Sequence, residues 1–270
     1  LVLQDITYKF PKWMKVLAKI GIMNIDKRKK IDLEPLCRLK NLKELFLGNI
    51  PVKNIKPLVS LKNLKQLSIS NVPISDLEPL RGLINLDTLL LYNTPVSNFE
   101  PIKELKKLQT LCLGRTQISD FSIIKQLPDL EILLIEDTRF SDLDLVTGLT
   151  RLRDLTIGDT QVTDLGPLKD LQNLQSLSIS GVSISNFGQL KELKNLQRLQ
   201  LQNTSITDLK DITELTKLQT LIINNAAISS LAPLKNLKDL ETLWFMSCHG
   251  ITDEQVEDLK EALPNCEIIR

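Results

Sequence analysis

The strongest constraint on this chain is a leucine that recurs with a constant 22-residue spacing. The spacing holds from Leu42 to Leu240, and Ile20 stands one period earlier. The copy that begins at Leu64 reads LKQLSISNVPISDLEPLRGLIN, and the copies share the template LxxLxLxxTx(I/V)(S/T)(D/N)LxPLxxLxx. A unit of this length cannot cover its own apolar side, so the copies must stack and bury a continuous core between neighbours. The repeat therefore predicts a solenoid.

The order of residue types within one copy predicts a strand followed by a short helical turn. Positions 4 and 6, counted from the recurring leucine, alternate with other residues as a strand requires. A Ser or Thr followed by Asp or Asn comes next, as in Ser75 and Asp76, and these side-chain oxygens can accept hydrogen bonds from the N–H groups that open a helical turn. Proline follows three residues later in six copies, inside the first turn, where its missing N–H costs little: Pro35, Pro57, Pro79, Pro101, Pro167 and Pro233.

These elements together predict an α/β solenoid. We expect a curved rod with parallel strands on the concave face and short 3-10 turns on the convex side, because a 22-residue unit leaves no room for long helices. Eleven stacked copies make one continuous domain: residues 1–19 form an N-terminal cap, 20–239 hold ten 22-residue repeats, and 240–270 hold a longer final repeat with its own cap.

Both ends of the rod are expected to be covered by helices. At the start, FPKWMKVLAKI places Phe10, Trp13 and Leu17 at helical spacing. At the end, EQVEDLKEAL is amphipathic, with its apolar residues facing inward, and it is followed by a last strand around Cys266. Cys248 and Cys266 fall on core positions of this final repeat.

The template resembles that of leucine-rich-repeat proteins, specifically the short 22-residue type found in internalins and many bacterial proteins, over residues 20–270. Position 9 departs from the family, where it is often Asn. It is Thr at 94, 116, 138, 160 and 204 and apolar at 50, 72, 182 and 226. We therefore expect no continuous row of buried position 9 asparagines along the rod. Threonine hydroxyls are expected to form the hydrogen bonds of the turn where they can reach them. The secretion signal and cell-wall anchor of internalins are not visible, so their adhesin role is not carried over.

The net charge, the lengths of the apolar runs and the cysteine spacing indicate which partners and which cellular compartment to expect. The 34 Lys and Arg against 33 Asp and Glu leave a net charge of +1, which argues against a general nucleic-acid binder and against a polybasic membrane-surface protein. No apolar run approaches the roughly 18–20 residues that cross a bilayer. The four cysteines show no paired spacing, which favours reduced thiols and a cytoplasmic protein, with a secreted effector or surface protein as the alternative.

The sequence carries no signature of catalysis. Its one histidine, His249, lies in a turn, and no set of His and Cys has the spacing of a zinc site. Phosphate-binding glycine loops and the serine-hydrolase elbow are absent. We therefore expect a protein that is not an enzyme and that uses no cofactor or metal.

Positions 3, 5 and 7 alternate with the core and should face the concave side, where large apolar residues need a reason other than folding. Two clusters of such residues are predicted there. The central cluster joins Leu90, Tyr92, Cys112, Ile132 and Leu134 and is bordered by Arg115, Glu136, Asp137, Arg153 and Asp154. The C-terminal cluster contains Ile222, Trp244 and Met246.

An apolar centre with a charged rim is typical of a protein interface. The leading hypothesis is a bacterial cytoplasmic module that docks a protein partner on its concave face, with Tyr92, Leu90 and Leu134 as anchors and with Glu136 and Asp154 selecting basic groups. Two other classes stay open. In the first, the chain is the ligand-sensing region of a larger bacterial immune receptor or effector, which its start at Leu1 rather than Met favours. In the second, it is a secreted or surface adhesin. The identity of the partner and the oligomeric state are left open.

Overall fold

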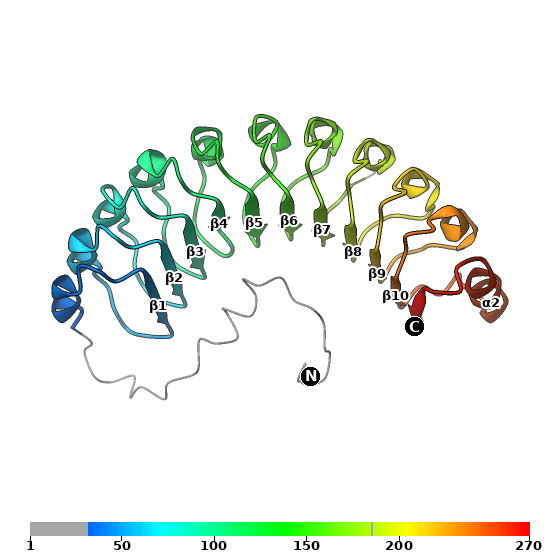
Figure 1. Cartoon of the computed structure of the whole chain (residues 1–270), viewed down its shortest axis with the longest axis horizontal. Coiled ribbons are helices and arrows are strands. Elements are labelled where there is room, and N and C mark those ends of the chain that lie inside the picture. Colours follow the sequence, from blue (N-terminus) through cyan, green and yellow to red (C-terminus); the bar gives the residue numbers. More distant parts are fainter. Residues whose placement is uncertain (1–31, 185) are drawn as a thin grey trace.

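The computed structural model describes residues 32–184 and 186–270, which coil into an arc with all strands on its inner side (Figure 1). The strands form one parallel sheet in strict chain order, and neighbouring strands from β1 to β10 pair residues that are 22 apart, as in Leu67 with Leu89. The eleven strands are β1 Glu44–Gly48, β2 Gln66–Ser70, β3 Thr88–Tyr92, β4 Thr110–Cys112, β5 Ile132–Glu136, β6 Asp154–Gly158, β7 Ser176–Ser180, β8 Arg198–Gln202, β9 Thr220–Asn224, β10 Thr242–Met246 and β11 Glu267–Ile269.

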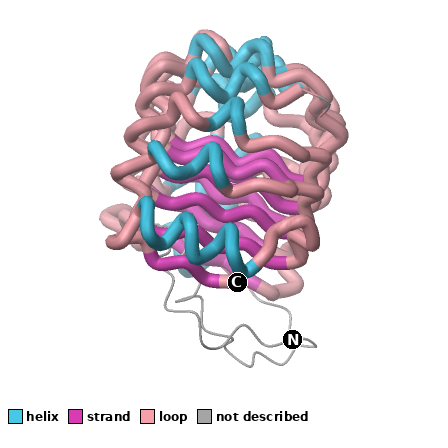
Figure 2. Tube along the Cα trace, turned by 90° about the vertical axis from the view of Figure 1, so that its right-hand side faces the viewer, coloured by secondary structure: helices cyan, strands magenta, loops and turns pink. Residues whose placement is uncertain are grey.

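The outer side of the arc carries short 3-10 helices, one for each coil, so that helices and strands lie on opposite faces (Figure 2). This confirms the predicted solenoid with parallel strands inside and short turns outside. The 3-10 helices are η1 Glu34–Arg38, η2 Lys56–Ser60, η3 Glu78–Leu80, η4 Glu100–Glu104, η5 Phe121–Gln126, η6 Leu143–Leu145, η7 Gly166–Asp170, η8 Gly188–Glu192, η9 Lys210–Ile212 and η10 Ala232–Asn236.

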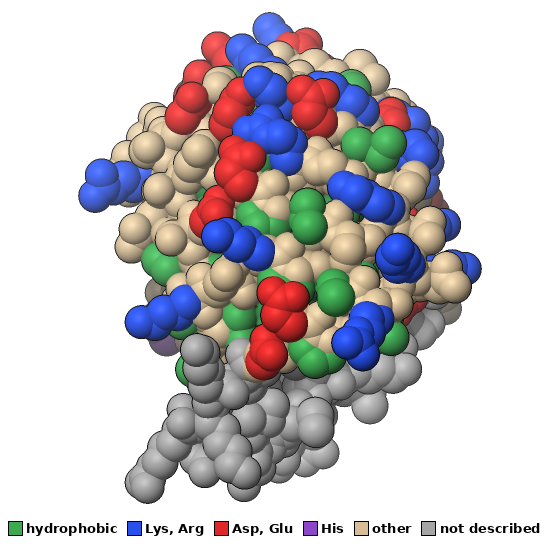
Figure 3. Space-filling view, turned by 90° about the vertical axis from the view of Figure 1, so that its left-hand side faces the viewer, with side chains coloured by type: hydrophobic (Ala, Val, Ile, Leu, Met, Phe, Trp, Pro, Cys, Tyr) green, Lys and Arg blue, Asp and Glu red, His purple; other side chains and the backbone are tan. Residues whose placement is uncertain are grey.

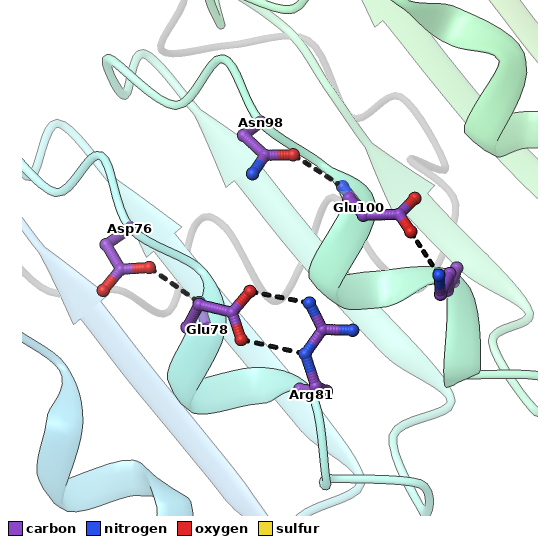
Figure 4. Close-up of polar contacts among 6 residues, drawn as sticks. Asp76, Glu78, Arg81, Asn98 and Glu100 are labelled. Atoms are coloured by element: carbon purple, nitrogen blue, oxygen red, sulfur yellow. Dashed lines mark hydrogen bonds and ion pairs between the residues drawn. The ribbon is translucent and has the colours of Figure 1, made fainter.

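Each turn onto the convex side is started by a side-chain hydrogen bond, as predicted. The Asp or Asn of the template accepts from the N–H two residues later. The distance from Asp76 Oδ1 to Glu78 N, for example, is 2.8 Å, and Asn98 repeats the contact one coil on (Figure 4). All ten 3-10 helices have this contact, with Ser230 in place of the acid or amide in the last. The six predicted prolines all lie in the first turn of their helices.

The core is one aliphatic column that runs along the rod. The recurring leucines from Leu64 to Leu218 are fully buried, and so are the position 4 and position 6 residues of most strands. Aromatic rings are rare in this column, where Phe121 and Phe140 make one edge-to-face contact. Because each coil covers the next, burial of the core depends on neighbours rather than on any one unit.

Position 8, two residues after the position 6 core residue, adopts a left-handed backbone in all ten coils from β1 to β10, with φ between 48° and 59°. In the first nine of these coils its N–H donates to the position 7 carbonyl of the next coil, as from Asn71 to Tyr92 at 3.0 Å. The residues are mostly Asn and Asp, which tolerate this conformation better than other non-glycine residues. They are Asn49, Asn71, Asn93, Arg115, Asp137, Asp159, Gly181, Asn203, Asn225 and Ser247.

The position 9 threonines serve the turn in only two of the five coils. Thr116 Oγ1 donates to the Leu113 carbonyl at 2.7 Å, and Thr138 Oγ1 accepts from Phe140 N at 3.4 Å. The buried hydroxyls of Thr94, Thr160 and Thr204 make no hydrogen bond to a described residue. The expected service of the turn by threonine hydroxyls therefore occurs at Thr116 and Thr138 and not in the other three coils.

The C-terminal cap matches the prediction. Helix α2, Asp253–Ala262, is capped by Thr252, whose hydroxyl accepts from Gln255 N, and it buries Val256 and Leu259 against the last coil. Strand β11 then pairs with β10. The predicted N-terminal cap of residues 1–19 and the start of the first repeat lie outside the described residues. None of the helices that the structure describes has the length and hydropathy needed to cross a bilayer.

The left-handed backbone at position 8 gives a test of stability at Ser247, whose φ is 54°. Because a β-branched residue is strained in this region and glycine is not, Ser247→Val should be less stable than Ser247→Gly by about 1–2 kcal/mol. Urea unfolding of the two variants measures the difference. At exposed Ala227, where φ is not positive, the valine variant should be at least as stable as the glycine variant. The same order at both positions would contradict the explanation.

Candidate functional site

The central cluster forms as predicted, but its three middle residues are buried and form the base of the site rather than an exposed patch. Leu90, Cys112 and Leu134 are register partners on β3, β4 and β5 and make an apolar cluster separate from the main core. Tyr92 and Ile132 are half-buried against it. The three middle residues are only 4%, 9% and 5% exposed. Their expected exposure is wrong because side chains on strands about 4.8 Å apart cover one another.

Tyr92 is the part of the cluster that a partner can reach, and a network of neighbours holds its ring in place. The ring lies over Gly114 on the next coil, where an added Cβ would come within 2.8 Å of its Cδ2 atom. The Arg115 guanidinium lies over the ring, 5.6 Å from its centroid, and Arg115 Nε donates to Asp137 Oδ2 at 2.6 Å. The aromatic face is therefore fixed before any partner arrives, which lowers the entropic cost of binding.

Two half-buried carboxylates lie on the same concave face. Glu136 ends β5 and passes over Gly158, whose added Cβ would lie 3.4 Å from its Cγ atom, and it makes no ion pair with a described residue. Asp154 is the first residue of β6, so it lies where the strands begin, whereas Glu136 lies where they end. Burial raises the pKa of both carboxyl groups. At Glu136 the nearby Asp137 and Asp159 raise the pKa further, whereas at Asp154 the Ser176 hydroxyl and two arginines oppose the rise. A cation brought by a partner would offset the cost of desolvating these charges.

Cys112 is a structural thiol. Burial in the apolar cluster raises its pKa to about 12, slightly offset by a hydrogen bond from the Gly114 backbone. The thiolate is the reactive form, so this side chain is inert near neutral pH. All four cysteines of the chain are free.

The C-terminal cluster is smaller and lies apart from the central one. Trp244 pairs in register with Ile222 on one side and Ile269 on the other. Ile222 is 7% exposed, whereas Met246 is 49% exposed. The position 5 residues Thr156, Ser178 and Gln200 separate the two clusters along the sheet. The structure therefore does not bring all the predicted site residues together.

Several residues that shape the site were missed by reasoning from the sequence. Gly114 and Gly158 make room for Tyr92 and Glu136, and Asp159 has a left-handed backbone like the predicted border residue Asp137. These two acids also line a groove of about 500 Å³ together with Thr116, Gln117, Ile118, Ser119, Thr138 and Arg139. The recurrence of Asn, Asp and Gly at position 8 was the available signal, since these types favour a positive φ.

Within the described residues, no group of three or more His, Cys, Asp or Glu side chains could hold a metal ion.

Comparison with known proteins agrees with the geometry of the coils. The family model for leucine-rich repeats (two copies) matches residues 40–82 and 194–236. No curated protein matches the sequence significantly. The coils of this chain have the leucine-rich-repeat fold. The conclusion rests on the model matches together with the 22-residue parallel coils.

Solved structures of bacterial leucine-rich-repeat proteins are similar to it. An internalin, InlF of Listeria monocytogenes, shares 27% identity with a TM-score of 0.76, and the match covers 86% of this chain and 67% of that one. The Leptospira interrogans protein LIC12759 shares 28% identity with a TM-score of 0.75, covering 87% and 62% respectively. This chain therefore spans about two thirds of the length of these relatives.

A more distant likeness concerns the fold alone. TLR13, solved in a complex with ssRNA13, shares 24% identity over 78% of this chain, with a TM-score of 0.63.

The burial of Cys112 predicts how its thiol reacts. At pH 8 a disulfide reagent such as Ellman's should leave Cys112 unmodified in the folded protein, because the thiol is neutral and only 9% exposed. Comparison with Cys112→Ser identifies its contribution: the substitution should leave the fast titre of the folded protein unchanged and lower the titre in guanidinium by one thiol. A lower fast titre in the variant would show that Cys112 is accessible.

Proposed function

We propose that this protein is a non-enzymatic interaction module that binds a protein segment across the middle of its concave face. The observation that carries the proposal is the rigid Tyr92 ring beside Arg115 and the Glu136 carboxylate, which has no ion-pair partner among the described residues. Aromatic anchors with charged neighbours dominate the binding energy of protein interfaces. Leu90 and Leu134 act as the floor under the anchor rather than as direct contacts.

The partner is expected to combine an apolar side chain with a basic one. The apolar side chain would pack on Tyr92 and Ile132, and a Lys or Arg would approach Glu136, whose half-buried carboxylate makes no ion pair with a described residue. Asp154 would select a second basic group where the strands begin. The four free cysteines support a reducing, cytoplasmic setting. That nucleic acid is not the partner stays a prediction.

Selection from a random peptide library displayed on phage tests the proposal, because the concave face then chooses its own ligands. Peptides retained by the wild-type protein should carry an aliphatic or aromatic residue next to Lys or Arg. Tyr92→Ala should weaken their binding about 30-fold, because loss of a central aromatic anchor typically costs about 2 kcal/mol or more. Isothermal titration measures the affinities.

Met246→Ala provides the matched control for this experiment, since Met246 is the exposed residue of the C-terminal cluster. It should leave the affinity unchanged. Peptides that bind Tyr92→Ala and wild type equally but lose affinity for Met246→Ala would move the site to the C-terminal cluster.

Glu136→Gln separates a binding role from a structural one. Because the folded protein raises the pKa of this carboxyl, its ionisation opposes folding: stability falls as pH rises from the unfolded toward the folded pKa, and the loss remains at neutral pH. The variant should therefore melt at the same or a higher temperature at pH 7, with no gain below pH 4. It should nevertheless bind the basic peptides at least 10-fold more weakly, as expected for loss of a desolvated charge pair. A lower melting temperature together with unchanged affinity would indicate a structural carboxylate.

A further inference from the structure

The net charge of +1 conceals a strong separation of charge along the sequence. Residues 1–65 contain 15 Lys and Arg against 5 Asp and Glu, and the rest of the chain contains 19 against 28, which together make the totals of 34 and 33. The expectation that charge excludes a membrane surface was based on the total. Within the described residues 32–65, seven Lys and Arg stand against three Asp and Glu, a cluster of the size that polybasic membrane-binding surfaces use.

The basic residues at this end form no ion pairs within the described chain. The seven in the described stretch are all exposed, and none makes an ion pair with a described residue. All ten ion pairs of the described chain lie from Glu78 onward. The seven are Arg38, Lys40, Lys43, Lys53, Lys56, Lys62 and Lys65.

Four of these lysines are stacked by the coil geometry. The segments 40–43 and 62–65 lie side by side, since Lys65 N donates to the Lys43 carbonyl at 2.7 Å and Asn63 Nδ2 donates to the Lys40 carbonyl at 2.9 Å. Lys40 is therefore followed by Lys62, and Lys43 by Lys65, one coil spacing further along the same edge. Figure 3 looks onto this end of the rod and shows Lys and Arg side chains along its right-hand side.

Large exposed apolar side chains gather at the same end. Of the five in the described chain, four fall between residues 39 and 84. Leu39, Val59 and Ile84 are about half exposed: Leu39 is next to Lys40, Val59 shares η2 with Lys56, and Ile84 lies in a turn. Ile84 occupies the position one coil beyond Lys62. The sequence before residue 32 continues this composition, with eight basic residues against Asp5 and Asp26 and with Phe10 and Trp13 among them.

We propose that the N-terminal end of the rod, residues 38–84, docks on an anionic membrane surface. The stacked lysines would face lipid headgroups, and Val59 and Ile84 would enter the interfacial layer, the arrangement that peripheral surface-binding segments use. The acidic remainder of the chain would be held away from the bilayer by repulsion. The inference is independent of the concave-face site.

The observations favour a membrane over a nucleic acid. Six of the seven basic residues are Lys rather than Arg, and Phe46, on the concave strand β1, is the one aromatic residue between 32 and 84. Single-stranded nucleic acids are bound on aromatic stacking platforms, which these turns lack, whereas exposed aliphatic side chains beside lysines suit a lipid interface.

The test is flotation of the full chain with vesicles of phosphatidylcholine alone or with one third of the lipid replaced by phosphatidylserine. Binding is expected only to the anionic vesicles and should fall with salt. The triple variant Lys40→Glu, Lys43→Glu, Lys65→Glu should lower the partition coefficient about 100-fold or more, since each basic residue near the surface contributes roughly a factor of five. Lys125→Glu, Lys169→Glu, Lys191→Glu is the matched control, because it changes the net charge equally through exposed lysines without ion pairs to described residues; it should bind like wild type.

Ile84→Ser provides the second readout. It should weaken vesicle binding several-fold at constant charge and leave the melting temperature unchanged, because Ile84 is 55% exposed. Fluorescence anisotropy with a single-stranded RNA and a duplex DNA runs in parallel. No binding to the anionic vesicles, or equal loss of vesicle binding in the two triple variants, would overturn the proposal. So would tight nucleic-acid binding, lost in the N-terminal variant, without vesicle binding.

Discussion

The hydrogen bonds between coils are the constraint on which the rest of the structure depends. No coil satisfies the backbone hydrogen bonds of its strand alone. Each strand pairs with the strands of the adjoining repeats, and in the coils of β1 to β9 the position 8 N–H donates to the position 7 carbonyl of the next coil. An extra residue within a strand would turn its leucines away from the core, and the constant 22-residue length avoids this from β1 to β10. The longer final repeat keeps the pairing of β11 with β10 because helix α2 takes up its extra residues outside the strands. The left-handed residues at position 8 follow from the same pairing between coils, since the chain must turn sharply while its N–H points to the next coil.

Once the register is fixed, the spacing of the strands sets the distance between equivalent side chains. Residues at equal positions of successive coils stand about 4.8 Å apart, so that Leu90, Cys112 and Leu134 are brought together without any contact designed between their segments. The same geometry stacks lysines at the edge of the first coils. Features that are far apart in the chain become surfaces because they share a position in the repeat.

Most of the fold could be predicted from the sequence because the same sequence pattern recurs in every repeat. The strand, the Asp or Asn that starts each turn, the six prolines and the C-terminal helix all follow from local rules applied to the template. The candidate site was predicted less well. The period assigns Leu90 and Leu134 to the concave face, but their exposure depends on the size of the neighbouring side chains, which the period does not encode. The roles of Gly114 and Gly158 depend on how Tyr92 and Glu136 lie, which is a matter of three-dimensional packing. The charge separation was visible in the sequence and was hidden only by summing over the whole chain.

The uniform register has a consequence for how such a protein can change over generations. Because neighbouring repeats make the same backbone contacts wherever they stand, an in-frame duplication or deletion of one whole coil leaves every hydrogen-bonding position with a partner. Such an event would lengthen or shorten the arc and shift the two ends relative to the tyrosine, without new residues having to evolve. Point substitutions on the concave positions could then adjust each copy separately. The length of the arc and the chemistry of its surface are thus changed by different kinds of mutation.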